Sequence, residues 1–116
     1  MSYRIINTTK STTLSKKVEV ADSFFTRLKG LMFRERMPWD EALIFYNSPS
    51  IHTFFMKFPI DIVFLDGDMR VIRIARNFEP WGVISCFKSY LTIELPPSKT
   101  AEEGLEVGDI LEILTA

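Results

Sequence analysis

The stretch that decides the fold is IHTFFMKFPIDIVFL, which spans residues 51–65. Its second half, Ile60 to Leu65, is apolar at every position except Asp61, and strands that are apolar on both faces lie inside a sheet or barrel. The turn sequence Asp66-Gly67-Asp68 follows, with its glycine expected at positive φ, and residues 69–75 read as the returning strand. We therefore predict a β-hairpin deep inside the molecule.

Short strands extend from this hairpin toward both ends of the chain, as β-branched residues and apolar alternation indicate. The expected strands are residues 3–8, 12–20, 42–46, 51–56, 90–95 and 110–114. Residues 77–88 read as irregular, one helix is predicted near residues 22–33, and a short helical turn near residues 100–104. About eight short strands with one helix predict a mainly β fold, a small β-barrel or half-open barrel, rather than βαβ units.

The chain has the size and composition of a single domain, residues 1–116. It is 47% hydrophobic with a net charge of −1, which argues against disorder and against a broad basic surface for nucleic acid. The polar N-terminus, residues 1–13, lacks the apolar core of a signal peptide, and no stretch is apolar enough to span a bilayer. We therefore expect a cytoplasmic protein without nucleic-acid or membrane partners, present as a monomer or weak homodimer.

Cysteine and histidine are too few for a metal centre. Cys86 is the only cysteine and His52 is the only histidine, so the chain has no internal disulfide and no cluster of soft ligands. The sequence also lacks a Walker loop, a dinucleotide fingerprint and the His-Glu-x-x-His and Gly-x-Ser-x-Gly motifs. We therefore expect no metal and no cofactor.

Three charged or titratable side chains interrupt the apolar stretch and form the first candidate site. His52, Lys57 and Asp61 must be paired, hydrogen-bonded or open to a cavity, because a lone buried charge is costly. If residues 51–56 are extended and their strand neighbours the next one, His52 and Asp61 can meet, with Lys57 at the rim. The cluster then either binds a small polar or anionic ligand, or is a structural network that sets the strand register.

Four more residues are candidates for the same pocket. Arg34 is suited to bidentate binding of a carboxylate or phosphate, or else is a solvated cation at a helix end. Glu94 joins the polar cluster if its face of the strand lines a barrel lumen, and otherwise faces water. Trp39 and Trp81 lie in expected loops, where they either stack on sugar rings or close the ends of the barrel.

Three ordered blocks of sequence resemble the signatures of a known prokaryotic family. They are residues 28–34, residues 52–57 with 59–66, and the pair Glu94-Leu95-Pro96 and Val107-Gly108-Asp109. On these blocks the chain is identified as a member of the family catalogued as domain of unknown function 192. The resemblance implies a small, mainly β, barrel-like domain and brings no established activity, cofactor or partner. It also implies that many relatives are exported behind a signal segment, which the N-terminus of this sequence does not show.

The residues leave three functions open. The first is a small-ligand-binding domain that takes a sugar or a carboxylate at His52, Lys57 and Asp61. The second is a protein-interaction module, in which the polar cluster is structural and an exposed edge strand or aromatic patch binds the partner. The third is a hydrolase in which Asp61 or Glu94 acts as general base with His52 as its partner.

Overall fold

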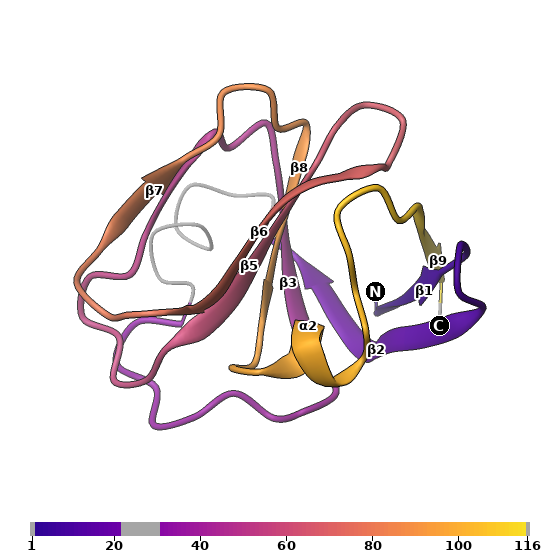
Figure 1. The fold of residues 1–116 in the computed structure, drawn as a ribbon. Helices are drawn as coiled ribbons and strands as arrows, with labels where there is room; N and C mark the ends of the chain where they lie inside the picture. Colours follow the sequence, from indigo (N-terminus) through magenta and orange to yellow (C-terminus); the bar gives the residue numbers. More distant parts are fainter. Residues whose placement is uncertain (1, 22–30, 116) are drawn as a thin grey trace.

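The computed structural model describes residues 2–21 and 31–115, and strands dominate their regular structure (Figure 1). The elements are β1 (Tyr3–Asn7), β2 (Thr12–Val20), β3 (Glu41–Tyr46), β4 (Ser50–His52), β5 (Ile60–Leu65), β6 (Val71–Phe78), β7 (Val83–Ser85), β8 (Leu91–Leu95), α2 (Lys99–Glu102) and β9 (Leu111–Thr115). The predicted mainly β class is confirmed. Residues 22–30 of the predicted helix lie outside the described residues, and residues 31–33 form a turn. In the described part of the chain, no helix has the length and apolarity to cross a membrane.

The described strands form one large curled sheet and one small sheet. The large sheet has seven strands in the order β6-β5-β8-β3-β2-β1-β9, and β4 pairs with β7 in the small one. The large sheet is antiparallel except between β2 and β3, which run parallel. β5 lies between β6 and β8 and is buried along its whole length, as its nearly uninterrupted apolar sequence predicts.

The two edges of the curled sheet meet at one end, which makes the fold a half-barrel. Arg70, the residue before β6, forms a bridge with Ile110, the residue before β9. Nearby, the N–H of Val71 donates to the carbonyl of Asp109 at 2.8 Å, and the N–H of Leu111 donates to that of Met69 at 3.0 Å. Edges paired in this way no longer offer those backbone groups to another chain. The predicted barrel or half-open barrel is therefore confirmed.

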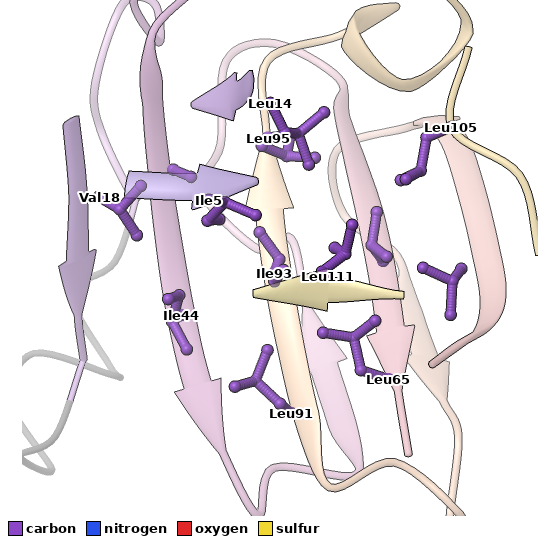
Figure 2. Packing of buried hydrophobic residues seen from close by; sticks show 13 residues of the cluster. Ile5, Leu14, Val18, Ile44, Leu65, Leu91, Ile93, Leu95, Leu105 and Leu111 are labelled. Atoms are coloured by element: carbon purple, nitrogen blue, oxygen red, sulfur yellow. The ribbon is translucent and has the colours of Figure 1, made fainter. Parts of the chain in front are cut away.

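Two apolar clusters pack against opposite faces of the large sheet. Figure 2 shows the first, in which Leu65 of β5 and Ile93 of β8 lie inside the curl with Ile5 of β1. The second joins Phe64 of β5 to apolar residues of β3, β4 and β7, and so lies between the two sheets. Alternate residues of β5 enter the two clusters, because successive side chains of a strand point to opposite faces. Full burial of a side chain such as Phe64 contributes about 1.5–3 kcal/mol.

The strand predicted over residues 51–56 is wrong in its second half. β4 ends at His52, and Phe55 has a positive φ of 63°, which is incompatible with a strand. Residues 53–56 form a turn instead, in which the N–H of Met56 donates to the carbonyl of Thr53 at 3.3 Å. β4 pairs with β7, which falls in the segment predicted to be irregular. Three residues carry too little periodicity to reveal such a strand.

The hairpin between β5 and β6 is present as predicted, but its positive φ belongs to Met69, at 62°, and not to Gly67. Asp66 holds the turn, because its Oδ1 accepts the N–H groups of Asp68 at 2.9 Å and of Arg70 at 3.0 Å. Aspartate side chains often stabilise turns by bonding to the backbone two residues further along. The carboxylate of Asp66 therefore sets the geometry that the sequence assigned to the glycine.

Candidate functional site

Asp61 is a fully buried acceptor that anchors the start of α2. Its Oδ1 accepts the N–H groups of Asn77 at 2.8 Å and of Ser98 at 3.2 Å. Its Oδ2 accepts both the N–H of Thr100 at 2.8 Å and the hydroxyl of Thr100 at 2.6 Å. A carboxylate offers about four lone-pair sites, and all of them are used here. Asp61 has no acceptor capacity left for a ligand or for a proton taken from a substrate.

His52, Lys57 and Asp61 do not come together. β4, which carries His52, pairs with β7, whereas β5, which carries Asp61, pairs with β6 and β8. The two strands are therefore not neighbours, and the contact that sequence reasoning allowed between them is not made. Lys57 lies between them in the chain and donates to Oε1 of Glu35 at 2.6 Å. Among residues 2–21 and 31–115, no hydrogen bond or ion pair joins any two of these three candidates.

His52 instead begins a row of aromatic rings. Its ring stacks on that of Phe54, with 4.8 Å between the centroids and 27° between the planes. Phe54 lies 6.0 Å from Trp81, and Trp81 lies 4.7 Å from Phe55. Phe55 in turn lies 5.3 Å from Phe33. We call the residues of this row the aromatic rim; they are Phe33, His52, Phe54, Phe55 and Trp81.

The rings of the aromatic rim are open to solvent. Phe33 is 62% exposed, Trp81 61% and Phe55 46%. The planes of neighbouring rings differ by 27° to 59°, so the rim presents ring faces in several directions. Single exposed apolar residues are common on proteins, but a contiguous group of them marks an interaction surface. The rim is therefore the strongest candidate site among the described residues.

Three residues of the rim hold a left-handed backbone. The φ angles are 65° at Phe33, 63° at Phe55 and 65° at Trp81. This conformation costs an L-residue roughly 1–2 kcal/mol, whereas glycine adopts it freely. Bulky residues at such angles are outliers, and strained backbone clusters at functional sites. The chain therefore tolerates strain at three positions that all carry exposed aromatic rings.

Thr53 joins the two loops that carry most of the rim. Its hydroxyl donates to the carbonyl of Glu79 at 2.7 Å and accepts the N–H of Gly82 at 2.9 Å. Its backbone N–H donates to the carbonyl of Gly82, and its carbonyl accepts the N–H of Trp81, both at 2.9 Å. Thr53 is fully buried, so these bonds are shielded from water. They lock the loops together and fix the position of Trp81.

Arg34 and Trp39 have partners outside the rim. Arg34 donates to both carboxylate oxygens of Glu41, at 2.8 and 2.7 Å, and this bidentate pair raises the pKa of the guanidinium. The ring of Trp39 lies 4.4 Å from Nζ of Lys99, which also donates to the carbonyl of Trp39 at 2.9 Å. Trp39 and Trp81 therefore belong to separate contact networks. The terminal nitrogens of Arg34, which could bind an anion, already bind Glu41.

Glu94 is a buried carboxyl in an apolar setting. β8 places it opposite Leu43 of β3 and Ile62 of β5, which both belong to the second apolar cluster. It is only 4% exposed, and burial raises its pKa to about 8. The alternative in which Glu94 faces water is therefore wrong. At neutral pH a carboxyl with this pKa keeps its proton, so Glu94 does not act as a general base there.

Comparison with known proteins places this geometry in a family. The family model for domain of unknown function 192 (DUF192), described as "Uncharacterized ACR", matches residues 5–113. The chain belongs to the DUF192 family. The resemblance seen in its sequence blocks is thereby confirmed, and the match covers both sheets of the DUF192 fold.

Relatives of this DUF192 protein align along nearly its whole length. A UPF0127 protein of Pyrococcus abyssi is 36% identical over 119 residues, which cover 96% of this chain and 97% of the relative. A UPF0127 protein of Thermococcus sibiricus is 37% identical over 116 residues, which cover 93% of this chain and 73% of the relative. The crystal structure of a protein of unknown function from Novosphingobium aromaticivorans superposes with a TM-score of 0.81 at 25% identity, over 97% of this chain and 84% of that one. None of these descriptions states an activity.

Sequence reasoning identified His52 and Trp81 as candidates but missed the three phenylalanines of the rim. Phe33 fell in the predicted helix, and Phe54 and Phe55 fell in the predicted strand. The adjacent pair Phe54-Phe55 carries no local signal of exposure, because adjacent residues such as Val63 and Phe64 of β5 are both buried, one on each face of the sheet.

Proposed function

We propose that this DUF192 protein is a binding domain that takes a saccharide on the aromatic rim. The observation that carries the proposal is the set of exposed aromatic residues at left-handed backbone positions, Phe33, Phe55 and Trp81. Glycine at these positions would remove the strain, and a polar residue would remove the exposed apolar surface. Aromatic residues at these positions relieve neither the backbone strain nor the exposure of apolar surface, so their presence supports a role in binding.

A saccharide fits the chemistry of the rim. A sugar ring has apolar C–H faces and polar hydroxyl edges, which match aromatic faces bordered by hydrogen-bonding groups. His52 supplies one such group. Its Nδ1 accepts the N–H of Phe54 at 3.3 Å, so the neutral imidazole carries its proton on Nε2 and donates from there.

The carboxylate ligand that the sequence also suggested has weaker support. Lys57 is paired with Glu35, and Arg34 is paired with Glu41 through both of its terminal nitrogens. At either position a carboxylate ligand would be repelled by the carboxylate that already neutralises the cation. The hydrolase alternative is weaker still, because the four donors at Asp61 and the retained proton of Glu94 leave neither group free to act as a base.

The two tryptophans of the chain allow a site-resolved binding experiment. A Trp39→Phe variant keeps Trp81 as its only tryptophan, and its fluorescence is titrated with neutral oligosaccharides built from gluco-, galacto- and mannopyranose units. The proposal expects a saturable change in emission with at least one of them. The matched Trp81→Phe variant keeps only Trp39, which lies in a separate contact network, and its emission should not respond.

A second variant measures how much the rim contributes to affinity. Trp81→Ala removes one stacking ring, so calorimetry should show weaker binding by about 1–2 kcal/mol, or roughly 5- to 30-fold. Circular dichroism verifies that the variant remains folded. If no saccharide alters the emission of Trp81, the proposal is refuted and the protein-interaction alternative becomes the better account of the exposed rings.

A further inference from the structure

We propose that the ion pair between Glu35 and Lys57 makes the aromatic rim selective for neutral over acidic saccharides. The inference rests on the proposed function, because it concerns which saccharides the same surface accepts. It assigns a specificity role to two charged residues that are not part of the aromatic rim.

The ion pair belongs to the same two chain segments as one end of the rim. Nζ of Lys57 is 2.6 Å from Oε1 of Glu35. Lys57 follows the rim residue Phe55 by two positions, and Glu35 follows Phe33 by two positions. The N–H of Phe33 donates to the carbonyl of Phe55 at 3.0 Å, and their rings lie 5.3 Å apart. The same two chain segments therefore carry the ring pair and the ion pair.

The ion pair cancels the charge at this end of the rim while it leaves polar atoms available. The side chain of Lys57 is 50% exposed and that of Glu35 is 81% exposed, so both can still bond to the hydroxyl groups of a ligand. Within residues 31–115, the exposed residues Arg36 and Glu79 lie close in sequence to the rim and carry opposite charges, so together they add no net charge. A neutral sugar gains donors and acceptors at this position without displacing either partner.

An acidic sugar meets a different environment. Its carboxylate would be repelled by Glu35, and the charge of Lys57 that could attract it is already neutralised by that same side chain. An ion pair this exposed contributes little to stability, so removal of its charge should leave the fold intact. Selectivity can therefore be tested separately from folding.

The test uses Glu35→Gln, which keeps the shape of the side chain and leaves the charge of Lys57 without its partner. The probes are the neutral oligosaccharide that gives the strongest response from Trp81 and its uronic acid counterpart, titrated in the Trp39→Phe background. The parent should bind the neutral probe more tightly. Glu35→Gln should shift the ratio of affinities toward the acidic probe by about fivefold or more, and this shift should shrink in about 0.5 M salt.

Glu112→Gln is the matched control, because it removes one exposed carboxylate from β9 and should leave the affinity ratio unchanged. A parent that prefers the acidic probe overturns the inference, and so does an unchanged ratio in Glu35→Gln; in both cases saccharide binding itself stands. If neither probe binds the parent, the proposed function fails and the inference fails with it. The two failures are therefore distinguishable.

Discussion

Replacement of Glu94 by glutamine should make the protein more stable at alkaline pH and should change it little at acidic pH. Glutamine has nearly the same shape as glutamic acid and stays neutral at every pH. Glu94 lies among apolar residues of the sheet, where burial raises its pKa from 4.5 to about 8. The folded protein therefore holds the proton over a pH range in which the unfolded chain has released it.

The magnitude follows from the difference between the two pKa values. Below about pH 4.5 both states are protonated and the carboxyl does not alter stability. Between about pH 4.5 and 8 the folded state binds one more proton than the unfolded state, so the free energy of unfolding falls as pH rises. A difference of about 3.5 pKa units corresponds to about 5 kcal/mol. Most of this decrease in the free energy of unfolding is complete at pH 8, and it should be absent in Glu94→Gln.

Urea denaturation followed by circular dichroism measures this effect. The free energy of unfolding of Glu94→Gln, minus that of the parent, should be under about 1 kcal/mol at pH 5 and about 4 kcal/mol at pH 8. Other carboxylates titrate in both proteins, so they cancel in the difference. Glu112→Gln reports the effect of removing an exposed charge. A difference that is constant with pH, or a glutamine variant that is less stable at pH 8, would refute the reasoning.

Three further variants test the structure around the site. Asp61→Asn removes an acceptor oxygen and leaves buried donors unpaired, so urea denaturation should show a free energy of unfolding lower by about 2–5 kcal/mol. Asp68→Asn, at an exposed position, should change the free energy of unfolding by no more than about 0.5 kcal/mol. Gly82→Ala places a Cβ 2.8 Å from the ring of Phe78 and should lower the free energy of unfolding by about 1–3 kcal/mol. The Cβ of Gly67→Ala meets nothing within 4 Å, so that variant should be nearly as stable as the parent. Equal losses of stability in the two variants would contradict the close approach of Gly82 to Phe78. Trp81→Gly relieves a strained φ and removes an exposed ring, so the free energy of unfolding should stay close to that of the parent while saccharide binding weakens as in Trp81→Ala. A destabilisation of about 3 kcal/mol or more would instead make Trp81 a core residue.

The strands were predictable because each one carries its pattern locally. β2 and β5 have the predicted bounds, since their apolar spacing is long enough to define both ends. β7 was not predictable, because it has three residues and exists through its pairing with β4. The positive φ of Met69 was not predictable either, because hydrogen bonds to the side chain of Asp66, and not local propensity alone, determine the turn.

The candidate site was less predictable than the fold. His52, Lys57 and Asp61 are close in sequence, and their proximity suggested one cluster. The turn after His52 sends the next strand into a different sheet, so the three side chains acquire separate partners. The partners of Lys57 and Asp61 lie far away in sequence, at Glu35 and Thr100, and no local pattern indicates either pair.

The sequence by itself determined the fold class, the central hairpin and the family, because these depend on periodicity, turn residues and motif spacing within short segments. The tertiary structure alone decided which strands meet at the edges of the half-barrel, that Glu94 is buried, and that Phe33, Phe55 and Trp81 meet at the surface. The physical reason is that burial and ring contact depend on which distant segments pack together. A linear pattern shows that a side chain is apolar or charged, but only the packed chain determines what surrounds it.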